Sequence, residues 1–340
     1  MRNNVHALVD ALGAGGTPDT RKDAAEALMK LLQGGDKACL DTVFATRGAV
    51  PRLVALVGDG NAMAKWCAAA ALRHLAVGDE ARMDAVFAAG VALPLVQMLR
   101  SGIDVLQECA AKALMEIGMG SAARAGMALD AGAVGPLVAM LCGTDLCKEH
   151  AAGALARLAF DSKRGAEEVA SAVEPLVALL GGVPLRASGS AAMALNSVAA
   201  LGEAWASAVA DAGAVPPLVG MVTSRVGFVW QNAAWTLLTL TAGSEVRAGL
   251  AAAAAAKQKQ LLVALLALII DSDSRAEQLA ETEDAEPYLA TLLAGMHGGE
   301  ALDKEREMAA ATRAAKGLRP IGSGTTLWQA WSMRVEHERV

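Results

Sequence analysis

Apolar residues along the chain recur in one phrase of about ten residues that occurs five times. The phrase opens with a small residue and contains proline shortly before Leu-Val, as in GAVPRLVALV from Gly48 and GAVGPLVAML from Gly132. Successive central leucines are 42, 42, 39 and 42 residues apart, and they are Leu53, Leu95, Leu137, Leu176 and Leu218. A period of this length indicates an array of stacked repeats.

A second phrase, in which small residues precede Ala-Leu, falls between the copies of the first. Its marker leucines are spaced by 42, 41, 40 and 42 residues, and they are Leu72, Leu114, Leu155, Leu195 and Leu237. A third, weaker phrase such as DEARMDAVFAAG precedes the glycines. Each repeat is therefore predicted to hold three short helices in a fixed order, divided by Gly, Asp and Ser turn residues. The composition agrees, because 54% of the residues are hydrophobic but only 3% are aromatic.

This pattern closely resembles the armadillo repeat, whose second helix opens Gly-Ala-hydrophobic-Pro-x-Leu-Val. Proline is harmless in the first turn of a helix, because the backbone N–H that it lacks would have no hydrogen-bond partner there. Glycine permits the sharp bend before that helix, which we expect at Gly48, Gly90, Gly132 and Gly213. The prolines placed in this first turn are Pro51, Pro94, Pro136, Pro175, Pro216 and Pro217. The resemblance implies an all-α, right-handed solenoid with three helices in each unit of about 42 residues.

The domain organisation follows from the regularity of the repeats. We expect a solenoid over residues 1–318, in which 5–47 form an N-terminal cap repeat and 48–256 form the regular repeats. Residues 257–318 are expected to form degenerate C-terminal repeats, since the ends of a solenoid need atypical caps. Residues 319–340 are expected to extend beyond it.

Charge and cysteine content restrict the class of partner and the compartment. The net charge of −6 gives no cationic footprint for nucleic acid. The most apolar run, Leu261 to Ile270, is too short for a membrane span, which needs about 20 residues. The five cysteines are an odd number without a disulfide pattern, which favours an intracellular protein, cytoplasmic by default, with a cilium or an organelle left open.

No motif for catalysis, a cofactor or a metal is found in the sequence. Asp271-Ser-Asp273 opens like a calcium loop but has Ala276 where glycine is required. Cys67, Cys109 and His150 share one position in successive repeats, but neighbouring helices are about 8–10 Å apart, too far for zinc ligands to converge. We therefore expect no catalytic residue, no cofactor and no metal.

In armadillo proteins the third helices line a concave groove that receives an extended peptide, so the resemblance implies binding of other proteins there. A nuclear-import receptor would carry Trp two residues before each marker leucine and Asn two residues after it, and only Trp235 matches. The candidate groove contacts are Trp66, His74, Lys112, Glu116, Arg157, Phe228, Gln231, Asn232 and Trp235. The alternative is that the aromatic residues pack against the next repeat and that Lys112 and Glu116 form an ordinary solvated pair on one helix.

The charge is unevenly distributed near the C-terminus. Residues 271–310 carry a net charge of −8, and residues 311–340 carry +3. In the last segment, apolar residues at helical spacing are candidate contacts with another subunit or, alternatively, with the solenoid's own side: Leu327, Trp328, Trp331 and Val335. The predicted function is a non-enzymatic scaffold that binds proteins as a subunit of a larger assembly, with a transient peptide adaptor or a transport receptor as the alternative.

Overall fold

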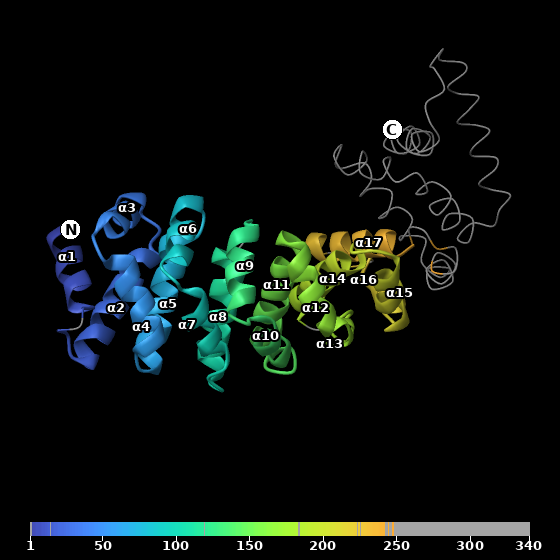
Figure 1. The fold of residues 1–340 in the computed structure, drawn as a ribbon, viewed down its shortest axis with the longest axis horizontal. Coiled ribbons are helices and arrows are strands. Elements are labelled where there is room, and N and C mark those ends of the chain that lie inside the picture. The colour runs from blue at the N-terminus through green and yellow to red at the C-terminus, as the bar shows by residue number, and fades with distance from the viewer. Residues whose placement is uncertain are drawn as a thin grey trace, which may run out of the picture. The chain divides into compact units, whose positions relative to one another are not determined.

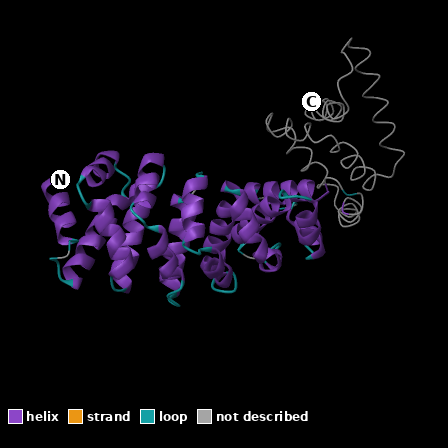
Figure 2. Cartoon of the chain, viewed as in Figure 1, coloured by secondary structure: helices purple, strands orange, loops and turns teal. Residues whose placement is uncertain are grey.

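A computed structural model describes residues 2–13, 15–118, 120–182, 184–222, 224, 226–241, 244 and 247. Over these ranges every regular element is a helix (Figure 2), which confirms the all-α expectation. The chain divides into two compact units, Met1–Pro175 and Leu176–Val340, called here unit 1 and unit 2. The boundary falls within α13 (Val173–Ala178). The expected degenerate repeats 257–318 and the extension 319–340 lie outside the described residues.

Unit 1 repeats three kinds of helix in the predicted order (Figure 1). The first helices of the repeats are α3 (Lys37–Ala45), α6 (Glu80–Ala88), α9 (Ala122–Asp130) and α12 (Lys163–Val169), the last followed by a 3-10 turn, η1 (Ala170–Ala172). The second helices are α1 (Arg2–Ala11), α4 (Ala49–Asp59), α7 (Ala92–Leu99) and α10 (Val134–Met140). The third helices are α2 (Pro18–Gln33), α5 (Ala62–Ala76), α8 (Asp104–Ile117) and α11 (Asp145–Asp161).

Unit 2 continues the same order. Its described helices are α14 (Leu185–Ala199), a third helix; α15 (Glu203–Asp211), a first helix; α16 (Val215–Met221), a second helix; and α17 (Gly227–Thr241), a third helix.

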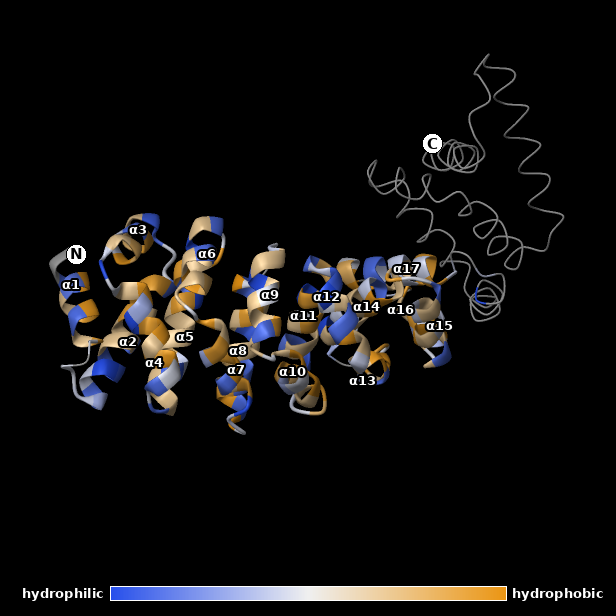
Figure 3. Cartoon of the chain, in the orientation of Figure 1, coloured by the Kyte–Doolittle hydropathy of each residue, from blue (hydrophilic) through white to orange (hydrophobic). Residues whose placement is uncertain are grey.

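The core of each unit is built on the marker leucines. Leu72 and Leu155 in unit 1 and Leu195 in unit 2 are fully buried, as are the leucines of the first phrase. Alanines such as Ala68 and Ala71 fill the contacts between third helices, and α5 packs against α2 and α8 in unit 1. Figure 3 shows hydrophilic residues on α3 and α6, whereas α5 is mostly coloured as apolar. Small side chains let the helices approach closely, as stacking requires.

The turns between first and second helices have the predicted geometry. Gly48, Gly90, Gly132 and Gly213 have φ angles of 84, 85, 76 and 86°, a left-handed conformation that favours glycine. Prolines follow within the first turn of the second helices α4, α7, α10 and α16, as Pro51 does in α4. The sequence phrase is therefore a turn followed by a helix start.

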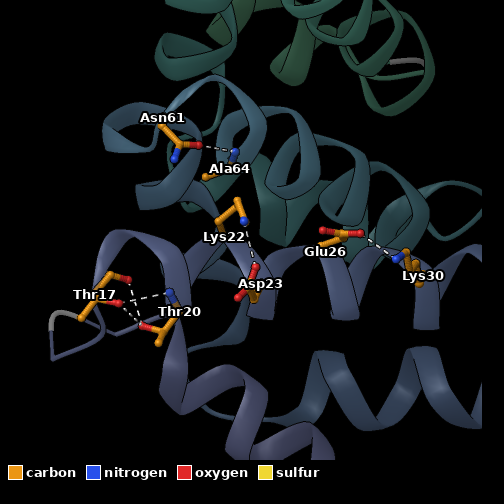
Figure 4. A network of polar contacts seen from close by, with 8 residues as sticks. All are labelled: Thr17, Thr20, Lys22, Asp23, Glu26, Lys30, Asn61 and Ala64. Atoms are coloured by element: carbon orange, nitrogen blue, oxygen red, sulfur yellow. Dashed lines mark hydrogen bonds and ion pairs between the residues drawn. The ribbon is translucent and has the colours of Figure 1, made fainter.

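Polar side chains cap the N-terminal ends of the third helices α2, α5 and α11. Oγ1 of Thr17 accepts a hydrogen bond from the backbone N–H of Thr20 at 3.2 Å, and Asn61 Oδ1 accepts one from Ala64 at 2.9 Å (Figure 4). Such caps pair backbone N–H groups that have no partner inside the helix.

A column of buried arginines joins the first helices of successive repeats. In unit 1, Arg124 on α9 is 1% exposed and binds Glu80 on α6 at 2.9 Å as well as Asp84. Arg82 on α6 binds Asp41 on α3 in the same way. In unit 2, Arg247 binds Glu203 on α15 at 2.7 Å, again about one repeat earlier in the chain. Arg82 and Arg124 are called here the arginine column, and Arg247 makes the equivalent contact within unit 2.

Gly165 occupies the column's position in α12. Like Arg82 and Arg124, it lies three residues after a capping residue, and its N–H donates to Ser162 Oγ at 2.9 Å. Only Ser162 separates α11 from α12, which brings the Leu158 carbonyl against Gly165. A Cβ at Gly165 would lie 1.8 Å from the Leu158 oxygen, so any side chain here is excluded.

Candidate protein-binding face

The third helices turn one stripe of residues away from the core. Positions nine, six, five and two before each marker leucine, and two after it, lie on the side of the helix opposite that leucine. These positions are called here the third-helix face. On α8 in unit 1 they are Val105, Glu108, Cys109, Lys112 and Glu116, none of which is fully buried. The face is therefore accessible along the helix while the marker leucine is buried.

Across α5 and α8, this face is held by an ion pair between neighbouring helices. Glu116 Oε2 lies 2.8 Å from Arg73 Nη1, and both side chains are mostly shielded from solvent. Arg73 Nη2 also lies 3.0 Å from Nε2 of His74. Glu116 is thus paired across repeats, which corrects the expectation of a solvated Lys112–Glu116 pair on one helix. The physical reason is that Arg73 and Glu116 are mostly shielded from solvent, so their charges attract each other more strongly than those of an exposed pair.

His150 on α11 lies in the same region of unit 1. Its Nδ1 atom is buried and has no hydrogen-bond partner among the described residues. Burial, reinforced by the charge of Lys112, lowers the pKa of His150, while Glu149, Glu108 and Glu116 oppose that shift. Burial and the neighbouring Arg73 and Lys112 also lower the pKa of His74, against Glu116. Both imidazoles are therefore held neutral near pH 7.

Lys112 and Arg157 are the candidate cations that contact no carboxylate directly, although the charge of Arg157 opposes the rise that burial causes in the pKa of Asp161. Neither has a hydrogen-bond or ion-pair partner within the part of the chain that the structure describes. Ala70 on α5 and Gly153 on α11, both small and buried, occupy the same register position as Lys112. Lys112 therefore supplies the only charge at this position of the three helices and could pair with a carboxylate or carbonyl oxygen of a partner.

On α2 the same register carries self-paired charges. Lys30 Nζ lies 2.6 Å from Glu26 Oε1, and Lys22 Nζ lies 3.0 Å from Asp23 Oδ1 (Figure 4). The charged residues of this face on α2 therefore neutralise one another, whereas the cations without an ion pair, Lys112 and Arg157, lie on α8 and α11.

In unit 2, the candidates on α17 also pack against the preceding third helix, α14. The Phe228 ring covers Gly189, where a Cβ would lie 2.4 Å from Cε2, although 37% of the Phe228 surface is exposed. The Asn232 amide donates to the Gly189 carbonyl at 3.0 Å. Gln231 and Trp235 are half-buried on the same stripe. Phe228 and Asn232 therefore contribute to repeat packing, and binding by this group stays a prediction.

Trp66 on α5 is half-buried, and its carbonyl accepts a long hydrogen bond of 3.8 Å from the Cys109 thiol. Burial raises the pKa of Cys109 to about 12, so this thiol stays protonated and unreactive at neutral pH. No group of three His, Cys, Asp or Glu side chains that could hold a metal occurs over the described residues. Cys67, Cys109 and His150 remain separate side chains in this structure.

Two further sequence expectations are located as follows. The apolar tail residues Leu327, Trp328, Trp331 and Val335 lie outside the described residues, as does Leu261–Ile270. Within the described ranges, no single helix has the length and apolar character to cross a membrane. The consecutive helices α6 and α7 reach that length together but are bent by 78°.

The structure also assigns roles to residues that sequence reasoning passed over. Arg73 was not among the candidates, although it holds Glu116. Asn196 on α14 accepts a hydrogen bond from the Thr239 hydroxyl on α17 at 2.6 Å and so joins the third helices of unit 2. The signal that could have found them is a polar residue directly after the marker leucine, which is the position of both Arg73 and Asn196.

The neutral histidines predict that stability falls in mild acid. Their pKa values are lowered in the folded state, so the unfolded chain binds more protons below its ordinary histidine pKa of about 6.5. The stabilising contribution is complete above that value and is lost as the pH falls through the folded pKa values. Urea midpoints measured from pH 7.5 to 5 should therefore decrease.

In a chain carrying His74→Gln and His150→Gln, the urea midpoint should decrease less between pH 7.5 and 5. His6→Gln is the matched control, because His6 is exposed on α1. An unchanged slope in the double variant would show that other groups cause the acid sensitivity.

No family model and no curated protein matches the chain. Solved structures do. A designed armadillo repeat protein is similar with 25% identity and a TM-score of 0.64, covering 69% of this chain and 99% of its own. An engineered protein is similar with 31% identity and a TM-score of 0.64, covering 70% and 96%. A second designed armadillo repeat protein, in complex with the peptide (KR)4, has 23% identity and a TM-score of 0.62, covering 69% and 99%.

Proposed function

Because the chain is an armadillo repeat protein, we propose that it is a non-enzymatic scaffold that binds other proteins through its third-helix face. In this proposal it works as a structural subunit of a larger assembly. The observation that carries the proposal is the pair of unpartnered cations, Lys112 and Arg157, on a face whose other charges are largely paired. A cation with its stem against apolar surface and its head unpaired is well suited to a partner's carboxylate.

The rest of the face supports binding and gives no support to catalysis. Catalysis by side chains needs an acid, base or nucleophile with a pKa matched to its task. The pKa of Cys109 is raised, and those of His74 and His150 are lowered, because these groups are buried in the packing between helices. The raised pKa keeps the Cys109 thiol protonated and therefore a poor nucleophile at neutral pH.

A transient adaptor for short peptides is the second candidate. It is supported by the designed armadillo repeat protein in complex with (KR)4, a basic peptide. The two functions differ in lifetime, because a structural subunit stays bound through purification and an adaptor exchanges. Co-elution of the partner in gel filtration at low concentration distinguishes them.

The proposal is tested with the full chain in extract from its natural source. An aromatic photo-crosslinking amino acid replaces Trp66 on the third-helix face or, as the control, Lys163, which is on the first helix α12. We expect partner crosslinks from position 66 and none from position 163. Lys112→Glu with Arg157→Glu should reduce the yield by about tenfold, a change of about 1.4 kcal/mol.

The matched charge reversals are Lys37→Glu with Lys163→Glu, both on exposed first-helix positions. They alter the net charge equally but leave the face intact. Equal losses in both double variants, or crosslinks only from position 163, would contradict the proposed face.

A further inference from the structure

Large apolar side chains recur at one position of three successive third helices in unit 1. Met63, Val105 and Leu146 are each the second residue of their helix, nine residues before the marker leucine. They are 54, 57 and 52% exposed, which is unusual for large apolar residues in register. These three residues are called here the ledge.

The ledge is continuous because α5, α8 and α11 pack side by side near their N-terminal ends. The Cys109 thiol of α8 lies 3.8 Å from the Trp66 carbonyl of α5. Thr144, which caps α11, lies 3.0 Å from Glu108 of α8. The ledge residues are therefore neighbours separated by one interhelical distance, about 8–10 Å.

That spacing selects the conformation of what can lie along the ledge. Seven residues of an α-helix advance about 10.5 Å, slightly more than one interhelical distance, and return to the same face, so a helix that crosses the ledge at a small angle matches it. A β-strand returns to the same face every two residues, after about 6.6 Å, so it cannot match every ledge residue. A polyproline segment advances about 9.3 Å in three residues, but such segments are recognised by aromatic-lined grooves. No ledge residue is aromatic.

The charges beside the ledge indicate the flank of the partner. Asp104 and Asp145 immediately precede Val105 and Leu146, and Asp59 lies four residues before Met63. Lys148 lies 3.6 Å from Asp145, and Arg21 lies 2.8 Å from Asp59. Asp104 is exposed and has no ion-pair partner over the described residues. The surface beside the central ledge residue, Val105, is therefore acidic and complements a basic group of a partner.

We propose that the ledge binds an amphipathic helix of a partner protein, with apolar side chains seven residues apart and basic residues along one flank. This inference rests on the proposed function and adds the conformation and chemistry of the bound segment. The apolar residues of the helix cover Met63, Val105 and Leu146, and a basic residue pairs with Asp104. Three anchors at this spacing require about four helical turns.

The experiment measures binding of two labelled synthetic helices of equal composition to the full chain. Both are alanine-based and carry lysine on one flank. One has leucine at every seventh position, and the other has leucine at every sixth, which turns the leucines off a single face. We expect the first to bind at least about tenfold more tightly. Equal affinities overturn the proposal.

The protein variants locate the site. Val105→Ser with Leu146→Ser should weaken binding of the first helix by about tenfold, and Asp104→Asn should weaken it further. Leu93→Ser with Met127→Ser is the matched control, since these residues are 53 and 42% exposed on α7 and α9. If both double variants weaken binding of the first helix equally, the ledge is not its binding site and the proposal is wrong.

Two further outcomes separate this inference from its alternatives. If the natural partner crosslinks equally well to the chain with Val105→Ser and Leu146→Ser, the ledge is wrong while the proposed function stands. If a chain without residues 320–340 binds the first helix tenfold more tightly than the full chain, the chain's own tail is the occupant. That result overturns the proposal that a separate protein occupies the ledge.

Discussion

Removing both carboxylates that bind Arg124 should destabilise the protein by about 3–5 kcal/mol, because the guanidinium would stay buried after losing the two carboxylates that contact it. The change is Glu80→Gln with Asp84→Asn, which keeps the size of both side chains. Arg124 is 1% exposed, so water cannot replace the lost carboxylates. Urea denaturation followed by circular dichroism measures the free energy of unfolding.

Removing Arg124 should lower the free energy of unfolding by less than removing its two carboxylates, although both changes break the same ion pairs. In Arg124→Met the buried charge is removed, and Glu80 and Asp84, whose side chains are 68 and 65% exposed, are solvated instead. The control is Glu167→Gln with Glu168→Gln on α12, whose partners Lys163 and Arg164 are exposed. Surface pairs contribute about 0–1 kcal/mol. A loss in the control equal to that in the first variant would contradict a special role for burial.

Gly165→Ala should cost about 3 kcal/mol, because the new Cβ would lie 1.8 Å from a backbone oxygen rather than from a flexible side chain. Relief requires the single-residue connection between α11 and α12 to move. The same substitution at Gly126, on α9, meets no atom within 4 Å and should stabilise the chain by about 0.5–1 kcal/mol. The sign of the two effects, measured by thermal unfolding, is the test. A stabilising Gly165→Ala would show that the connection is not closely packed.

The fold could be predicted from the sequence because its determinants are local and repeated. Proline after Gly48, the left-handed φ of that glycine and the burial of Leu53 each depend on a few neighbouring residues. Their recurrence in every repeat makes a chance match improbable. The marker leucines also set the rotation of each third helix, so its outward stripe could be assigned before the structure was known.

Pairings between repeats could not be predicted in the same way. Glu116 has Lys112 four residues earlier in its own helix, yet it pairs with Arg73 on the neighbouring helix. The Phe228 ring covers Gly189 because Gly189 has no side chain to block it, and the Asn232 amide on the same helix donates to the Gly189 carbonyl. Both contacts depend on how closely two helices approach, which is decided by residues some 43 positions away.

The arginine column has a consequence for how such an array can change its length. Helix α6 carries both halves of the contact: Arg82 binds the preceding repeat, and Glu80 and Asp84 receive the arginine of the following one. A tandem copy of residues 80–121 would therefore bring a matching cation and matching carboxylates to each new junction. The repeat beginning at α12 has Gly165 at that position, and Lys163 and Glu167 where α6 has Glu80 and Asp84. A copy of the repeat at α6 would thus be joined to its neighbours by buried ion pairs, whereas a copy of the repeat at α12 would not.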